Sequence, residues 1–237
     1  MLISPYITPT LCKEKVKDSF SKAAATYDKL GVIQRKASQE LVQAVAHTQH
    51  RPAKTILDLG SGTGFVTEAL VPHYPSAAYT LLDLSEEMLE VAGLKLREAA
   101  PHGNFTYIQQ DMEVPIEGRY DLIVSNFALQ WATDLEMLLA KIAASVEMCF
   151  AFSTLLDGTF SEWHKLYEGV GAPPPMLAGI SDYPMYEEIR LHLDVLYSSV
   201  KSWTRDYTMI FTSPLSFAKY LCGLGAAAIS SPYPNSA

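Results

Sequence analysis

The stretch TILDLGSGTGF at residues 55–65 decides the fold of this chain. The apolar run at 56–59 has the length and composition of a strand that is buried on both faces. Glycines at 60, 62 and 64 follow directly, and an amphipathic stretch at 67–73 comes next. A loop without side chains lets a ligand lie against the backbone, and the next helix begins with free N–H groups. The stretch therefore predicts a strand, a ligand-binding turn and a helix.

The same alternation continues on the C-terminal side of this stretch. We expect further strands at 79–82, 105–108, 122–124 and 149–152, and helices at 86–99 and 134–146. Ser85 and Asp134 stand where they can cap the two helices. Strands alternating with helices predict an α/β fold, in which helices cover both faces of a mostly parallel sheet.

The flanking regions have weaker patterns. Residues 13–48 have the apolar periodicity of helices, and Arg51-Pro52 marks the boundary with the alternating region. Further on, residues 186–193 suggest a helix, 195–200 and 202–211 a strand or hairpin, and 217–221 a short helix.

Polar side chains follow the predicted strands at the edge where an open α/β sheet binds its ligands. Asp83 closes the second strand, where a carboxylate can accept both hydroxyls of a ribose. Asp111 and Met112 close the third, where an acid can accept from an adenine amine and a thioether can pack on the ring. Asn126 and Phe127 follow the fourth. A turn, a helix cap or a loop would explain each of these alone, but their common placement indicates a nucleoside pocket.

The glycine spacing argues against a dehydrogenase. The dinucleotide fingerprint is G-x-G-x-x-G, and its third glycine would fall here on Phe65.

Composition excludes several other classes. The chain has 237 residues, a formal net charge of −8 and a pI near 5.2, so it would repel the phosphates of nucleic acids. Its three cysteines lack C-x-x-C spacing, which argues against zinc or a disulfide framework and fits a reducing cytoplasm. No apolar run reaches the roughly 18 residues of a membrane span, and we see no secretory signal.

One segment of this acidic chain is basic. Between residues 13 and 36 there are seven basic and three acidic side chains. This surplus is either a solvated helix face or a docking surface for an acidic partner. The candidate docking residues are Lys13, Lys15, Lys17 and Lys22.

Residues 55–154 resemble the class I S-adenosylmethionine-dependent methyltransferases, which have a Rossmann-like fold. The flanking strings FSKAAATYD (20–28), SNFALQW (125–131), FSTLLDGTFSEW (152–163) and CGLGA (222–226) are similar to those of the malonyl-[acyl-carrier protein] O-methyltransferases of biotin synthesis. The resemblance implies methyl transfer from S-adenosylmethionine to the free carboxylate of malonyl-acyl carrier protein. The methyl ester then primes pimeloyl synthesis.

The resemblance also divides the chain and implies a cofactor site. Residues 1–48 would form a helical lid, 49–154 the cofactor-binding core, and 155–237 the acceptor side of the same domain. The implied cofactor-binding residues are Tyr27, Asp58, Gly60, Ser61, Gly62, Gly64, Asp83, Leu84, Asp111, Met112, Asn126 and Phe127.

Two departures from the family pattern bear on the acceptor. The family ends in an apolar strand that runs antiparallel into the sheet, and we find no candidate for it here. Cys222 stands where the family commonly has a basic residue. The malonyl carboxylate needs no general base, since its ordinary pKa near ~4 leaves it ionised at neutral pH. Arg190, Arg205 and Lys219 are candidates to hold it.

Two other functions remain open from the sequence. The chain can be a methyltransferase for a free small acid or a quinone-type ring, or a module that binds S-adenosylmethionine without catalysis.

Overall fold

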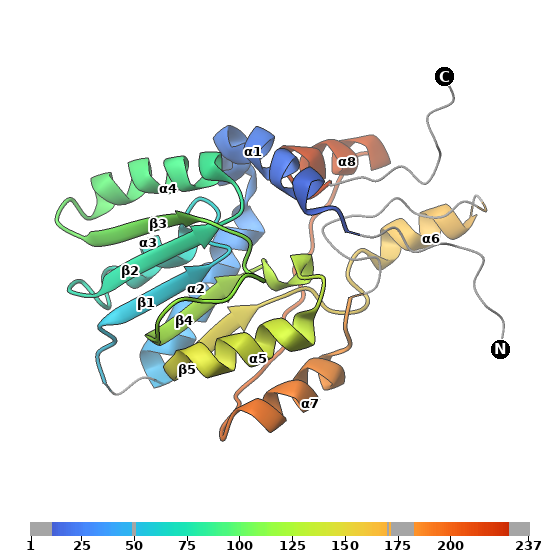
Figure 1. Ribbon diagram of the computed structural model, residues 1–237. Helices are drawn as coiled ribbons and strands as arrows, with labels where there is room; N and C mark the ends of the chain where they lie inside the picture. Colours follow the sequence, from blue (N-terminus) through green and yellow to red (C-terminus); the bar gives the residue numbers. More distant parts are fainter. Residues whose placement is uncertain (1–10, 49–50, 170, 172–182, 228–237) are drawn as a thin grey trace.

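A five-stranded parallel sheet forms the centre of the computed structural model, which describes residues 11–48, 51–169, 171 and 183–227 (Figure 1). The strand order is β3-β2-β1-β4-β5, and all four pairings are parallel. The strands are β1 (Thr55–Leu59), β2 (Ala78–Asp83), β3 (Asn104–Gln109), β4 (Tyr120–Asn126) and β5 (Val146–Ser153). The predicted parallel sheet is therefore confirmed, and its order reverses direction between β1 and β4.

Helices cover both faces of this sheet, as the alternation predicted. One face carries α2, α3 and α4, and the other carries α5 and α7. The helices are α1 (Lys13–Leu30), α2 (Val32–Thr48), α3 (Phe65–Leu70), α4 (Glu86–Ala99), α5 (Leu135–Ser145), α6 (Ser161–Gly169), α7 (Tyr186–Leu196) and α8 (Pro214–Gly223), with a 3₁₀ turn η1 (Leu129–Trp131).

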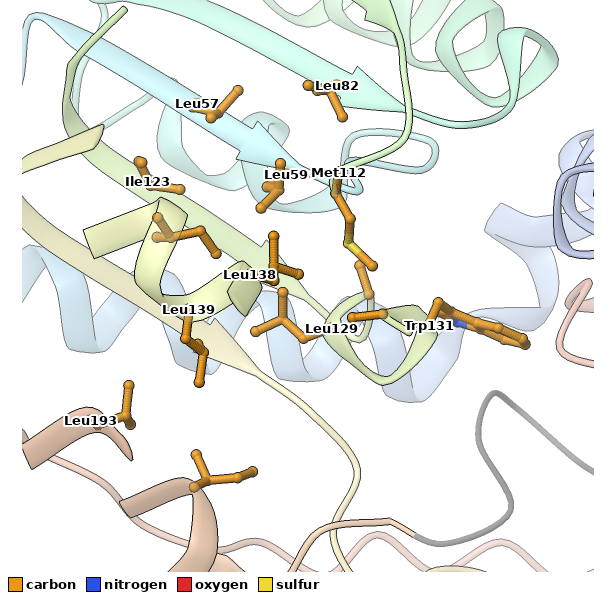
Figure 2. Packing of buried hydrophobic residues seen from close by; sticks show 14 of the residues in the cluster. Leu57, Leu59, Leu82, Met112, Ile123, Leu129, Trp131, Leu138, Leu139 and Leu193 are labelled. Carbon is orange, nitrogen blue, oxygen red and sulfur yellow. The ribbon is translucent and has the colours of Figure 1, made fainter. Parts of the chain in front are cut away.

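Strand β1 shows how its sequence fills both layers. Ile56 packs among the helices α2, α3 and α4, whereas Leu57 and Leu59 point to the opposite side, toward α5. Figure 2 shows this second layer, where Leu138 and Leu139 of α5 lie against the sheet. The period of two along the strand explains why apolar residues are needed on both of its sides.

Both predicted helix caps are present. The Ser85 side chain accepts a hydrogen bond from the backbone N–H of Met88, and Asp134 accepts one from that of Met137. These caps fix where α4 and α5 begin, directly after the strand-end loops that carry the candidate site.

The predicted helical region at 13–48 consists of two helices, which meet at Gly31. The Gly31 N–H bonds to the carbonyl of Tyr27, and a β-carbon on Gly31 would lie 2.9 Å from that oxygen and 3.0 Å from the ring of Phe65. A glycine is therefore needed at this turn. Helix α2 packs in the layer with α3, β4 and β5, whereas α1 lies by the carboxyl ends of the strands (Figure 1).

The C-terminal region confirms two predicted helices and corrects the strands between them. Helices α7 and α8 include the predicted segments 186–193 and 217–221. Residues 197–213, by contrast, contain no strand, so the expected strand or hairpin at 195–211 is wrong. A segment rich in β-branched and aromatic residues becomes a strand only where a partner strand offers it hydrogen bonds, and here none of the described residues does so. The described part of the chain likewise contains no antiparallel pairing.

Two leucines on helices give a matched test of this core. Leu139 on α5 is fully buried and Leu191 on α7 is 69% exposed. We expect Leu139→Ala to lower the free energy of unfolding by about 2–5 kcal/mol, because it leaves a cavity between α5 and the sheet. Leu191→Ala should change it by less than about 0.5 kcal/mol. Urea unfolding measures both, and equal effects would contradict the assignment of α5 to the core.

Candidate functional site

A cavity opens at the carboxyl ends of β1, β2 and β4, with helix α1 along one side. It encloses about 790 Å³ of empty space, its mouth included. Eleven of the twelve predicted cofactor-binding residues line it, namely Tyr27, Asp58, Gly60, Ser61, Gly62, Asp83, Leu84, Asp111, Met112, Asn126 and Phe127. The structure thus brings together residues that lie as far as 100 positions apart in the sequence.

The first two glycines of the loop after β1 lack side chains for different reasons. Gly60 has a φ of +67°, and a β-carbon there would lie 2.3 Å from the β-carbon of Ala128. Gly62 has a φ of +53° and open space where a β-carbon would be. The first glycine therefore allows close backbone packing, and the second leaves the cavity side of the loop bare.

Gly64 is the predicted residue that does not line the cavity. Its φ is +79°, and a β-carbon on it would meet Ala92 and Leu96 of α4 and Leu81 of β2. It starts α3 and lies against the core, so its role here is close helix packing.

The Asp58 carboxylate is buried beside the cavity. Its Oδ2 accepts hydrogen bonds from the backbone N–H of Thr67 at 3.2 Å and the Thr67 hydroxyl at 2.6 Å. Its Oδ1 is buried and has no hydrogen-bond partner among the described residues. Burial raises the pKa of Asp58 to about 7, although both Thr67 donors and the charge of Lys95 act against the rise. An unpaired carboxylate oxygen of this kind suits a cationic ligand group.

Asp83 ties the end of β2 to the glycine loop. Its Oδ2 accepts the N–H of Gly62 at 2.7 Å, and its Oδ1 accepts that of Ser85 at 2.9 Å. Burial raises the pKa of Asp83, and these backbone donors oppose the shift. Each carboxylate oxygen can accept a second hydrogen bond, so Asp83 can still receive two hydroxyls from a ligand.

A charged contact closes the far end of the cavity. Lys13 at the start of α1 lies 3.2 Å from Asp111 Oδ1 and 2.5 Å from Glu113 Oε2. Burial disfavours the charge on Glu113, but Lys13 together with donors from Thr133 and Asp134 holds its pKa at about 2. Lys13 was predicted as part of a surface patch, but it lines the cavity instead, as the one lysine or arginine that does so among the described residues.

Asn126 and Phe127 shape the wall formed by β4. The Asn126 amide donates to the carbonyl of Gln34 at 3.0 Å and accepts from the Ser153 hydroxyl at 2.7 Å. Phe127 has a φ of +51°, which costs a bulky residue about 1–3 kcal/mol. Its N–H donates to the carbonyl of Ser153, which helps to hold this strained residue at the cavity.

Aromatic rings from α1, α3 and η1 surround the cavity. Tyr27 and Phe65 have ring centroids 5.9 Å apart, and Phe20 meets Trp131 edge to face at 5.2 Å. Burial, and then the nearby charge of Asp83, raises the pKa of the Tyr27 hydroxyl, so that it stays a proton donor.

Sequence reasoning did not assign the other residues that line the cavity. They are Val16, Phe20, Phe65, Val66, Leu82, Met88, Gln110, Ala128 and Trp131. Two signals could have found part of this set. Residues 13, 16, 20 and 27 share one face of α1 at helical spacing, and Phe65 follows the last glycine directly.

The three candidate cations for the acceptor do not line the cavity. Arg190 pairs with Asp194 on α7 at 2.9 Å, and Arg205 pairs with Glu40 of α2 at 3.3 Å. Lys219 is exposed on α8. The structure therefore does not bring these side chains to the cofactor cavity.

The described part of the chain has no group of three or more histidine, cysteine or acidic residues that could hold a metal ion. None of its helices is long and apolar enough to cross a membrane.

Sequence relatives identify the family. A methyltransferase domain model matches residues 56–147. The malonyl-[acyl-carrier protein] O-methyltransferase of Neorickettsia risticii is 30% identical over 222 residues, which are 92% of this chain and 84% of that protein. The enzyme of the same name from Priestia megaterium is 34% identical over 158 residues, 65% of this chain and 56% of its own length. The chain also matches 46% of the biotin biosynthesis bifunctional protein of Bordetella avium, at 32% identity.

Solved structures share the fold. Magnesium protoporphyrin IX methyltransferase from Synechocystis PCC 6803, solved with bound SAH, superposes with a TM-score of 0.66 and 20% identity. The match covers 82% of this chain and 94% of that one. This likeness confirms the predicted Rossmann-like methyltransferase fold. The match along most of the Neorickettsia protein shows that the chain belongs to the malonyl-[acyl-carrier protein] O-methyltransferase family of S-adenosylmethionine-dependent methyltransferases.

Proposed function

We propose that this chain transfers a methyl group from S-adenosylmethionine to the free carboxylate of malonyl-acyl carrier protein, giving the methyl ester used in biotin synthesis. The observation that carries this proposal is the relationship to the Neorickettsia enzyme along 92% of the chain. The cavity supports it, because its strand-end residues suit the methyl donor.

The residues around the cavity fit the parts of this donor. Asp58 has a buried, unpaired oxygen that can accept from the ammonium group. Asp83 can accept from the ribose hydroxyls, and Asp111 and Met112 can meet the adenine. The bare backbone at Gly62 leaves room for the methionine portion. When bound, the donor supplies an electrophilic methyl group on a positively charged sulfur.

The chain's own part in the reaction is to position the reactants and exclude water. A malonyl carboxylate is already ionised at neutral pH, so no general base is required. The charges of carboxylate and sulfonium disappear during transfer, and a dry site does not stabilise them in the ground state. The rings of Phe20, Phe65 and Trp131 give the cavity such walls.

The same argument bears on the acceptor carboxylate. A cation paired with this nucleophile would stabilise the reactant more than the transition state, in which the negative charge is being lost. Lys13, the cation at the cavity, is itself bound by Asp111 and Glu113. We therefore propose that the acceptor is oriented mainly through the rest of the malonyl thioester, while Arg190, Arg205 and Lys219 serve other contacts.

The carrier protein would meet the outer face of α1. Lys15, Lys22 and Lys29 are exposed and lie seven residues apart, so they share one face of the helix. Of the four residues of the predicted patch, Lys13 faces the cavity. Lys17 is half-buried and lies near Glu87, whose pKa is lowered by the Ser21 hydroxyl and, to a smaller extent, by Lys17. The exposed stripe formed by Lys15, Lys22 and Lys29 is therefore the part of the basic segment that fits an acidic carrier.

The activity itself can be tested with methyl-labelled S-adenosylmethionine and three possible acceptors. With malonyl-acyl carrier protein we expect a base-labile methyl ester. A methyl ester formed only on a free small acid, or methylation of a quinone-type ring, would indicate a small-molecule enzyme. Cofactor binding with no transfer to any acceptor would indicate a non-catalytic module.

Asp58 predicts a pH dependence of cofactor binding. Its pKa is about 7 in the free chain, and the ammonium group binds the ionised form, so affinity should rise with pH. Below pH 7 the affinity should fall by about tenfold for each pH unit. Calorimetry from pH 5.5 to 8 measures this. Asp58→Asn should bind weakly with a flat profile.

Two further measurements separate the loss of cofactor binding in Asp58→Asn from a general disturbance of the fold. Asp121 also accepts two backbone N–H groups, from Lys54 and Thr55, but at the opposite edge of the sheet. Asp121→Asn should keep the pH profile of the parent. Because the pKa of Asp58 is raised in the folded chain, stability falls as pH rises from about 4 to about 7 and then stays at the lower level, so Asp58→Asn should raise the melting temperature at pH 8. A sloping profile in Asp58→Asn would disprove the role.

Reversing the charges of the exposed stripe tests whether this face of α1 binds the carrier protein. We expect Lys15→Glu, Lys22→Glu and Lys29→Glu together to raise the apparent KM for malonyl-acyl carrier protein by about tenfold at low salt, and less at high salt. The KM for S-adenosylmethionine should not change.

A charge-matched control lies at the other end of the molecule. Changing Arg51, Lys54 and Arg119 to glutamate alters the net charge equally, near the amino ends of the strands. If this control raises the carrier KM as much as the stripe variant does, the effect is one of net charge and the docking surface is wrong.

A further inference from the structure

Four charged side chains, one from each of the first four helices, form a closed ring behind the glycine loop. Arg35 of α2 lies 3.6 Å from Asp28 of α1 and 3.3 Å from Glu68 of α3. Lys95 of α4 lies 2.9 Å from the same aspartate and 3.6 Å from the same glutamate. Each charge therefore has two neighbours of opposite sign.

The two cations of this ring of ion pairs lie against an aromatic side chain that lines the cavity. The Arg35 guanidinium lies 4.2 Å from the centre of the Phe65 ring, and the Lys95 ammonium lies 4.4 Å from it. Phe65 lines the cavity and also contacts the ring of Tyr27. Both cations thus hold a cavity residue directly, through cation–π contacts.

The ring also reaches the cavity through the backbone of α1. Asp28 follows Tyr27, and the turn at Gly31 brings Arg35 back toward both. The Gly31 N–H bonds to the Tyr27 carbonyl at 2.7 Å, and the Arg35 N–H bonds to the Gly31 carbonyl at 2.9 Å. A shift of α1 away from the core would therefore move Tyr27 and break the contacts of Asp28 together.

These contacts fix the relative positions of the four helices more than they add to the free energy of folding. The Lys95 side chain is 16% exposed and that of Arg35 is 40% exposed, so the pairs are partly buried and water screens them in part. Single pairs that water reaches contribute little to folding. Four of them that share partners, however, hold four helices at one point.

We propose that the ring of Asp28, Arg35, Glu68 and Lys95 is a positioning device that fixes Tyr27 and Phe65 against the cofactor cavity, so that cofactor affinity depends on it. The inference rests on the proposed function, because the ligand is the methyl donor or its product. The ring residues touch no reacting atom. They act through the two aromatic side chains and the last turns of α1.

The test measures binding of S-adenosylhomocysteine to the full chain and its variants by calorimetry. Lys95→Met and Arg35→Met each remove two ion pairs and one cation–π contact, and each should raise the Kd by about fivefold or more. Lys95→Arg, which keeps the charge, should restore the Kd to within about twofold of the parent. The Kd of the parent should rise with salt more steeply than that of Lys95→Met.

The Arg35→Met variant tests another explanation for weaker binding in Lys95→Met, namely a change in the pKa of Asp58. The charge of Lys95 also lowers the pKa of Asp58, whereas Arg35 is not among the groups that shift it. Weaker binding in both methionine variants at pH 8 therefore points to the ring. Weaker binding in Lys95→Met alone would assign the effect to Asp58 and overturn the proposal.

A matched control and a second readout separate positioning from stability. Arg119→Met removes the exposed Arg119–Glu147 pair at the amino ends of β4 and β5, and it should leave the Kd unchanged. Hydrogen exchange of the amides in the last turns of α1, without ligand, should be faster in both ring variants and unchanged in the control. A lower melting temperature with parental Kd and parental exchange would show that the ring only stabilises the fold.

These outcomes are independent of the acceptor. A chain that binds S-adenosylhomocysteine normally but methylates no carrier protein would contradict the proposed function and leave the ring proposal standing. Parental binding in Lys95→Met and Arg35→Met, in a chain that does methylate the carrier, would contradict the ring proposal alone.

Discussion

The cofactor cavity depends on one close approach, between the glycine loop after β1 and the ends of the two neighbouring strands. On one side, Gly60 packs against Ala128 at a distance that leaves no room for a side chain. On the other side, the end of β2 binds three successive backbone N–H groups of the loop. The Leu82 carbonyl accepts two of them, and the Asp83 carboxylate accepts the third, from Gly62. These contacts hold Gly60 and Gly62 in positive-φ conformations and leave open space on the cavity side of Gly62.

Helix α1 completes the cavity from the other direction, and polar contacts near its start, middle and end hold it in place. Lys13 near its start binds Asp111 and Glu113, Ser21 in its middle bonds to Ser85, and Asp28 near its end joins the four-charge ring. Between these points the helix presents apolar and aromatic side chains to the cavity. Buried apolar packing also fixes α1, since Ala23 and Ala24 lie against Met88 of α4. Its charged contacts are partly exposed, so salt screens them more than it affects the apolar contacts that hold the sheet.

Much of this arrangement was predictable from the sequence, because it depends on local patterns. The strands at 56–59 and 79–82, the capping side chains Ser85 and Asp134, and the acids at strand ends each follow from short-range rules. What failed depends on partners far away in the chain. Residues 195–211 have the β-branched and aromatic composition of strands, but strand formation needs a neighbour that the described residues do not supply. Arg205 seemed available for the acceptor because its partner, Glu40, lies 165 residues earlier.

Lys13 is another residue whose partners could not be predicted from the sequence, and its contacts determine the charge of the cavity. In the sequence it belongs to a run of lysines, and only the packing of α1 separates it from Lys15 and Lys22 on the outer face. Inside, two carboxylates offset its charge, so the cavity gains no free cation from it. The charged groups left to a ligand are then acidic, and they suit a donor that is itself positively charged. A methyl transfer between a sulfonium and a carboxylate loses charge as it proceeds, and a cavity that pairs its own cation leaves the incoming carboxylate more reactive.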